Sequence, residues 1–214
     1  MPRKTRFYMI CLRDSVGSNA AFHCHNGGGY STSIDRAQVF TLKEAQAYWN
    51  TLRPIDLPVC ADSVDKQAVI HVDHQHVPGS TVIEEGCTQY VAFVKGQWDG
   101  NDLYWLRDGG LPTTDFTKAS IYANANTESD GLVWLPFHIA DGVKRRTFPL
   151  HLLNRRRMVQ GAGLRIPDHI RKANRKQRNS GKTRWNCPVC GRFSYQDHPY
   201  EFEGCKNSAC GDSK

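Results

Sequence analysis

The chain has 214 residues, of which 39% are hydrophobic and 23% charged, a composition typical of a soluble globular protein with one to three small domains. No apolar run is long enough to span a bilayer, and the N-terminal residues lack the apolar core of a secretory signal, so we expect neither a membrane anchor nor a signal peptide. Without a signal, the eight cysteines favour a reducing, cytoplasmic location over a secreted, disulfide-bonded protein.

The net charge of +7 is unevenly distributed along the chain. Residues 1–143 contain eleven Lys or Arg and sixteen Asp or Glu, whereas residues 144–184 contain fourteen Lys or Arg and a single acid, Asp168. Residues 185–214 are close to neutral, with three basic and four acidic residues. A separate basic block of this kind is typical of a segment that binds a polyanion, most often nucleic acid.

The first 54 residues are predicted to form a β-hairpin followed by a helix. Two apolar runs, 7–13 and 20–25, flank residues that favour turns, which is the pattern of two antiparallel strands. Thr41 is followed three residues later by Glu44, the spacing of a capping box at the N-terminus of a helix.

A second copy of this hairpin is predicted further along the chain. When the sequence is shifted by 82 positions without a gap, identical residues coincide at strands and turns: Tyr8 and Tyr90, Asn19 and Asn101, Gly27-Gly28 and Gly109-Gly110, Thr32 and Thr114, and Ala37 and Ala119. Turn glycines and buried strand positions are those that backbone geometry and packing constrain most. We therefore interpret residues 88–143 as a repeated β-hairpin module, joined to the first by a β connector at 55–87.

Residues 144–184 are predicted to be a basic helical connector. Residues 150–159 have the pattern of one amphipathic helix, and a second helix is expected to begin at Pro167. Arginine, which can bind phosphate in a bidentate manner, outnumbers lysine here by ten to four. The candidate nucleic-acid-binding residues are Arg155, Arg156, Arg157, Arg171, Lys172, Arg175, Lys176, Arg178, Lys182 and Arg184. A solvated linker without a ligand is the alternative interpretation.

Four cysteines near the C-terminus have the spacing of metal ligands. Cys187 and Cys190 form one pair, and Cys205 and Cys210 form a second pair after fourteen intervening residues. Two thiol pairs at this separation suit a tetrahedral zinc ion, with two disulfides or an iron–sulfur cluster as alternatives. Four thiolates leave no coordination position open, so the Zn²⁺ would be structural, and it would fold a tail that is too small to bury a core of its own.

With these cysteines and the strand-forming aromatic residues between them, residues 185–211 resemble the zinc-ribbon family. The resemblance implies a small hairpin between two metal-binding loops. It also implies four zinc ligands, which are Cys187, Cys190, Cys205 and Cys210. His198 lies between the two cysteine pairs, and we interpret it as a loop residue rather than a ligand.

Asp73, His74 and His76 form the one cluster that suggests catalysis. Together with the following Pro78-Gly79, they resemble the Asp-His-x-His core of ββα-metal nucleases of the His-Asn-His type. The resemblance implies that His74 is a general base and that Asp73 and His76 bind a metal ion. The alternative interpretation is a cluster of exposed histidines at the edge of a hairpin.

These features predict an α+β protein with two repeated β-hairpin modules, few helices, a basic helical connector and a C-terminal zinc ribbon. The expected boundaries are 1–54, 55–87, 88–143, 144–184 and 185–214. The expected function is that of a non-enzymatic, cytoplasmic regulator that binds nucleic acid or a nucleoprotein complex and has no membrane partner.

The compact size and the appended ribbon are in the style of bacteriophage accessory proteins. One form of this expectation is therefore a phage accessory factor that acts on a host transcription, translation or defence complex. Two alternatives remain open. One is a metal-dependent nuclease that uses Asp73, His74 and His76. The other is a protein-interaction module whose basic helices dock on an acidic partner.

Overall fold

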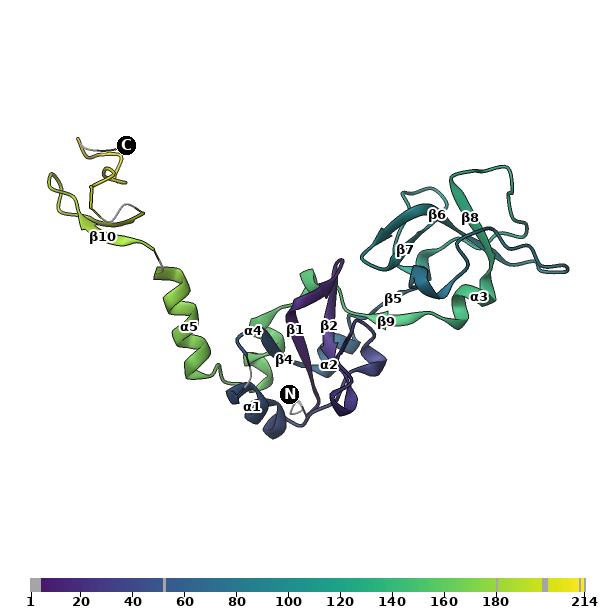
Figure 1. Ribbon diagram of the computed structural model, residues 1–214, viewed down its shortest axis with the longest axis horizontal. Helices are drawn as coiled ribbons and strands as arrows, with labels where there is room; N and C mark the ends of the chain where they lie inside the picture. The colour runs from purple at the N-terminus through teal and green to yellow at the C-terminus, as the bar shows by residue number, and fades with distance from the viewer. Residues whose placement is uncertain (1–4, 52, 180, 198–199, 212, 214) are drawn as a thin grey trace. The chain divides into compact units, whose positions relative to one another are not determined.

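The structure is a computed structural model that describes residues 5–51, 53–179, 181–197, 200–211 and 213, with the backbone alone for 174–179. Its contacts divide the chain into two compact units, Met1–Arg165 (unit 1) and Ile166–Lys214 (unit 2). Strands outnumber α-helices among the described residues, and both occur in each unit (Figure 1). The protein is therefore of the α+β class, as predicted. Within these residues, no helix combines the length and the apolar character needed to cross a membrane.

The first sheet of unit 1 is antiparallel, with the strand order β3-β2-β1-β4. Its strands are β1 (Phe7–Val16), β2 (Asn19–His23), β3 (Tyr30–Ser31) and β4 (Asp56–Cys60). The first five residues of β1 and all five of β4 are buried, which requires cover on both faces of the sheet. The helices that contact β1 or β4 are α1 (Leu42–Thr51), α2 (Ala61–Asp65) and α4 (Arg155–Met158).

The predicted capping box lies at the start of α1. The backbone N–H of Thr41 donates to Oε2 of Glu44 at 2.8 Å, and the backbone N–H of Glu44 donates to Oγ1 of Thr41 at 3.3 Å. These two bonds satisfy N–H groups that have no partner inside the helix. The helix then buries Ala45 and Trp49. The predicted capping box is confirmed.

The second sheet of unit 1 is antiparallel, with the strand order β7-β6-β8. Its strands are β6 (Tyr90–Asp99), β7 (Asp102–Trp105) and β8 (Leu132–Pro136), and β8 leads into α3 (Phe137–Gly142). Trp105 is fully buried in the core of this sheet. Its ring centroid lies 5.6 Å from that of Phe93 and 4.8 Å from that of Phe116.

A two-stranded ladder of β5 (Val69–His71) and β9 (Arg145–Thr147) joins segments that are far apart in the sequence. Residues 145–147 belong to the basic block, yet they pair with β5 as part of unit 1. Short 3₁₀ helices link the strands of this unit: η1 (His25–Gly27), η2 (Ile34–Arg36), η3 (His74–His76), η4 (Phe116–Lys118), η5 (Leu150–Leu152) and η6 (Gln160–Ala162).

The single helix predicted for residues 150–159 is wrong, because η5 and α4 are separate elements. Asn154 lies between them in an extended conformation, and its Oδ1 accepts a hydrogen bond from the backbone N–H of Arg157 at 3.0 Å. An asparagine in this position starts a helix instead of continuing one.

Backbone hydrogen bonds recur at matched positions in the two sheets of unit 1. Phe7 and Phe40 exchange two bonds of 2.8 Å, as do Tyr90 and Tyr122. Each hairpin also bonds to the segment that follows β5 or β9. In the first hairpin, Ala20 donates to Phe148 and Ser18 accepts from Leu150. In the second hairpin, Leu103 donates to Val72 and Asn101 accepts from His74 in the same way. Corresponding residues are 83 apart in the hairpins, 82 apart from η2 and η4 to Phe40 and Tyr122, and 76 apart from β4 and β8 onward. The single shift of 82 predicted from the sequence therefore applies to the middle segment.

The turns of the two hairpins touch at Gly17 and Gly100. Both glycines have a positive φ, +57° and +62°. A Cβ atom on Gly17 would lie 2.6 Å from the backbone nitrogen of Gly100, and a Cβ atom on Gly100 would lie 2.8 Å from Cα of Gly17. The close approach and the left-handed backbone both require glycine here.

Buried polar residues meet beside this contact. Asp102 is fully buried and accepts hydrogen bonds from Asn19 and, at 2.6 Å, from the guanidinium of Arg145. Nδ1 of His71 lies 2.7 Å from the same carboxylate and 2.9 Å from Oγ1 of Thr147. A buried carboxylate requires such partners, so this cluster fixes the register of β5 against β9 and of both against β7.

The described residues of unit 2 form one helix, α5 (Asp168–Asn179), and a hairpin of β10 (Thr183–Asn186) and β11 (Phe193–Gln196). The helix follows Pro167, as predicted. The two strands pair in register from Thr183 with Gln196 to Asn186 with Phe193. The loop that joins β10 to β11 carries Cys187 and Cys190, and the segment after β11 carries Cys205 and Cys210. The hairpin therefore encloses the first cysteine loop, whereas the resemblance implied a hairpin between the two loops.

Candidate metal centre and basic residues

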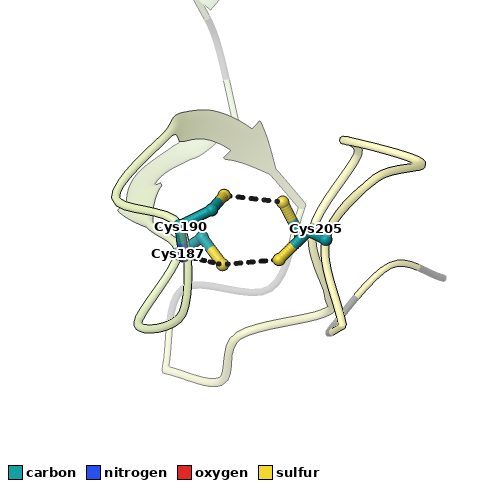
Figure 2. A group of neighbouring side chains, drawn as sticks. Cys187, Cys190 and Cys205 are labelled. Carbon is teal, nitrogen blue, oxygen red and sulfur yellow. Dashed lines mark hydrogen bonds between the residues drawn. The ribbon is translucent and has the colours of Figure 1, made fainter.

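The four C-terminal cysteines converge on one point in unit 2. Their Sγ atoms all lie within 4.8 Å of one another, with Cys187 3.7 Å from Cys210 and Cys190 3.5 Å from Cys205 (Figure 2). These distances are much longer than the S–S bond of a disulfide, which is about 2.05 Å. Four sulfurs at about 2.3 Å from one tetrahedral ion would lie about 3.8 Å apart, so the arrangement suits a single metal ion.

The first cysteine loop begins where β10 ends. The backbone N–H of Cys187 donates to the carbonyl of Arg192 at 2.8 Å, and the N–H of Gly191 donates back to the carbonyl of Cys187 at 2.9 Å. Gly191 closes this turn with a φ of +70°, which glycine adopts without strain. The N–H of Cys190 points at the sulfur of Cys187, 3.5 Å away. The loop thus holds two sulfurs on the same side (Figure 2).

The second cysteine loop has a wider spacing and a similar set of bonds. The backbone N–H of Asn207 points at the sulfur of Cys205, 3.5 Å away, and the N–H of Cys210 donates to the carbonyl of Asn207 at 2.9 Å. Cys205 also forms a parallel bridge with Ser213. The four intervening residues are therefore accommodated by a turn that brings Cys210 back beside Cys205.

The environments of the thiols differ. Cys187, Cys205 and Cys210 are buried, whereas Cys190 is exposed. A hydrogen bond from the backbone N–H of Arg192 lowers the pKa of Cys190 to about 6. The N–H of Asn207 acts in the same direction on Cys205, but burial and the neighbouring thiols outweigh it and raise the pKa of Cys205. The thiolate is the metal-binding form of cysteine, and backbone N–H groups aimed at sulfur stabilise it.

Gln196 supports the centre, a role that no pattern in the sequence indicates. It is 1% exposed. Its Nε2 donates to the carbonyl of Gly204 at 2.7 Å, and its Oε1 accepts from the backbone N–H of Glu203 at 2.6 Å. Gln196 therefore ties the end of β11 to the residues that precede Cys205. Only its position next to the aromatic strand residues could have drawn attention to it. His198 lies outside the described residues.

The predicted phosphate-binding residues are divided between the two units. Arg155, Arg156 and Arg157 form most of α4 in unit 1, and all three are exposed. In the part of the chain that the structure describes, no ion pair involves their side chains. The seven others belong to unit 2, so the ten residues lie on both sides of the division at residues 165 and 166.

Within unit 2, Arg171 and Lys172 are exposed on α5, and Arg171 lies 3.5 Å from Asp168. Lys182 lies 3.4 Å from Asp197, and the guanidinium of Arg184 lies 4.6 Å from the ring centroid of Phe193. For the remaining three candidates the structure describes the helical backbone alone. They are Arg175, Lys176 and Arg178.

Asp73, His74 and His76 are not brought together as a metal-binding group. Among the described residues, the cysteine cluster is the only such group of three or more possible ligands. Asp73 caps η3 by accepting the backbone N–H of Gln75 at 2.9 Å, and it also accepts Nδ2 of Asn101 at 3.1 Å. The ring of His74 stacks on Trp98 at a centroid distance of 4.4 Å. These contacts give both residues structural partners in unit 1.

The chain matches no protein-family model, no curated protein and no solved structure. The chemistry of the protein must therefore be inferred from the geometry of these residues.

Proposed function

We propose that this protein binds nucleic acid through its basic residues and that Zn²⁺ folds unit 2. The observation that carries the proposal is the run of three consecutive exposed arginines in α4. Arg6, Arg53 and Arg146 each lie within 3.2 Å of a carboxylate. The three arginines of α4 are exposed and have no such partner among the described residues. Their charge is therefore available to an anion outside the chain.

Phosphate is the anion that such a group suits best. Guanidinium groups bind phosphate oxygens in a bidentate manner and keep their charge at any physiological pH. Contacts of guanidinium groups with phosphate hold a sugar–phosphate backbone in place without reading its sequence. The exposed Arg171 and Lys172 of α5 would make a separate contact of the same kind from unit 2. A nucleoprotein complex of a host cell is the class of partner that we propose. Binding of this kind weakens steeply as salt rises, because bound counterions are released.

Zinc is the metal that the four cysteines of unit 2 fit best. Sulfur distances of 3.5 to 3.7 Å between neighbouring thiols would suit a single ion, whereas an iron–sulfur cluster would place its own sulfides between the ligands. The residues that would hold the ion are Cys187, Cys190, Cys205 and Cys210. When bound, Zn²⁺ supplies folding energy and no reaction chemistry, because all four positions are taken by protein.

The matched hydrogen bonds of the two sheets support the view that residues 5–165 are a duplicated module. In this proposal the second copy lacks a counterpart of α1, and β5 and β9 are equivalent strands that pair with each other. The duplicated body would carry the arginines of α4 on a rigid support and would offer its surface to a protein partner.

The function can be tested by fluorescence anisotropy of a labelled 20-nucleotide strand and its duplex, with the full chain, between 50 and 300 mM salt. We compare the variant Arg155→Gln, Arg156→Gln, Arg157→Gln with the control Lys43→Gln, Lys66→Gln, Lys95→Gln. The control removes the same charge from exposed sites of unit 1. Each lost phosphate contact reduces the slope of log K against log salt by about 0.9 on duplex DNA.

In the arginine variant, we expect the slope of log K against log salt to be shallower by about 2 to 3. We also expect its affinity at 100 mM salt to be about 10- to 100-fold weaker. The lysine control should change affinity by less than about threefold. Equal losses in both variants would show that net charge alone matters. Binding that does not depend on salt, or no binding at all, would refute the proposal.

A further inference from the structure

The hairpin of unit 2 has one inward face and one exposed face. Along both strands, residues alternate between more and less exposed positions. The less exposed residues are Thr183, Trp185, Ser194 and Gln196. The exposed residues are Arg184, Asn186, Phe193 and Tyr195. Because Arg184 pairs with Tyr195 and Asn186 with Phe193, these four side chains form one continuous patch, which we call the β10–β11 platform.

Two aromatic rings lie at the centre of this platform. Phe193 is 59% exposed and Tyr195 is 45% exposed. They stand two residues apart on β11, and their ring centroids lie 6.2 Å apart at an interplanar angle of 86°. Neighbouring exposed rings on a strand offer flat apolar surface that water solvates poorly. The faces of unpaired bases fit such surface, and stacking on it does not depend on the base.

Basic side chains lie beside the same rings. The guanidinium of Arg184 lies 4.6 Å above the ring of Phe193, where its plane can itself stack on a base. Phe193 also lines a cavity of about 200 Å³ together with Arg192, Lys206 and Asn207. These groups place two further cations and an amide beside the platform. An apolar partner alone would leave these cations without a counter-charge.

We propose that the β10–β11 platform binds single-stranded nucleic acid by stacking unpaired bases on Phe193 and Tyr195, with Arg184, Arg192 and Lys206 on the adjoining phosphates. This inference rests on the proposed nucleic-acid-binding function and adds to it a separate site for unpaired strands. In a duplex the base faces are covered by their neighbours, so a duplex can reach the cations but not the rings. The platform therefore distinguishes single strands from duplexes without reading their sequence.

The test compares a single-stranded and a duplex oligonucleotide of equal length with the full chain. The variant is Phe193→Leu, Tyr195→Leu, which keeps apolar side chains and removes both rings. The matched control is Tyr48→Leu, since Tyr48 is 50% exposed in unit 1. Metal content is measured for each protein, because a folded unit 2 is required. Phe193→Tyr, Tyr195→Phe is the conservative variant that keeps both rings.

We expect the double leucine variant to bind the single strand about 10- to 100-fold more weakly, with duplex affinity and salt slope unchanged because no charge is lost. The control and the conservative variant should bind like the original protein. Ultraviolet cross-linking to an oligonucleotide that contains 4-thiouracil should attach it to residues of β11, and this readout does not require a variant to fold.

The outcomes separate this inference from the proposed function. If the original protein binds neither oligonucleotide, both proposals fail. If it binds both, and the leucine variant weakens neither or weakens both equally, the platform is wrong and the function stands. Cross-links found only outside residues 183–196 would also overturn the platform. A platform that instead contacts an acidic protein would show unchanged single-strand affinity in the leucine variant, which counts against the inference.

Discussion

Each of the two units of this protein is stabilised by a different means. Unit 1 buries large apolar residues on two sheets and ties them together with hydrogen bonds between distant segments. Unit 2 has a buried cluster made of Cys187, Cys205 and Cys210, with Phe202 packed against it. A domain this small cannot bury enough apolar surface to fold by that means alone. The comparison teaches that the stability of one unit should be independent of metal and that of the other should depend on it.

Metal removal should have the largest effect and should act on unit 2 alone. Structural zinc sites supply on the order of 10 kcal/mol of binding free energy, more than the whole stability of many small domains. Adding a strong chelator, or changing Cys187→Ser, should collapse the amide NMR signals of residues 183–211 into the unfolded range. Signals from unit 1 should not move. The control is Cys87→Ser, a cysteine outside the cluster. Dispersed signals from a metal-free unit 2 would disprove the metal-dependent fold.

A core substitution in unit 1 should have the opposite distribution of effects. Trp105 is fully buried between Phe93 and Phe116, so Trp105→Ala should destabilise unit 1 by about 3 to 5 kcal/mol. The urea midpoint of unit 1 would fall, while metal content and the signals of unit 2 stay the same. Loss of metal from this variant would mean that the two units fold together, and the comparison would then be wrong.

The smallest of these effects concerns the capping box of α1. Thr41→Ala removes a side-chain cap and should cost about 1 kcal/mol in the stability of unit 1. Ser33→Ala is the matched control, because Ser33 lies at the N-terminus of η2 without a side-chain capping bond. Urea unfolding of both variants measures the difference. A cost for Ser33→Ala as large as that for Thr41→Ala would show that the cap contributes nothing specific.

The same cap should respond to pH. The backbone N–H of Thr41 lowers the pKa of Glu44 below its usual value. A carboxylate with a lowered pKa stabilises the fold above its unfolded pKa, and this contribution disappears as the pH falls through the folded value. The difference in stability between the original protein and Glu44→Gln, which removes the charge of this side chain, should therefore shrink when unfolding is repeated in acid below that value.

Local patterns were the part of this structure that the sequence predicted well. The cysteine spacing predicted a cluster because each pair closes a short loop, and Thr41 with Glu44 predicted a helix start because the capping bonds span three residues. Pairings between distant segments left no such pattern. Residues 145–147 contain two arginines and were grouped with the connector, yet they form β9 opposite β5.

Because such distant pairings leave no local pattern, counting charges could not separate arginines that are paired with a carboxylate from arginines that are exposed and unpaired. Arg145 and Arg146 lie in the basic block, but Arg145 is paired with Asp102 and Arg146 lies 2.7 Å from Asp35. Composition cannot show which carboxylates the fold brings close to each arginine. The platform was likewise visible only in part, because the alternation of aromatic residues on β11 is local, whereas Arg184 reaches them through strand pairing.

The contact between Gly17 and Gly100 has a consequence for the history of the chain. If the two halves of unit 1 descend from one module, a half-length ancestor could have formed a symmetric homodimer, with this turn meeting its own copy on the two-fold axis. A single glycine in the gene would then have met the demand of both turns. The neighbouring pair of Asn19 and Asp102 could not have existed in that dimer, because identical subunits would place two asparagines or two aspartates face to face. Gene fusion would have freed the two positions to differ.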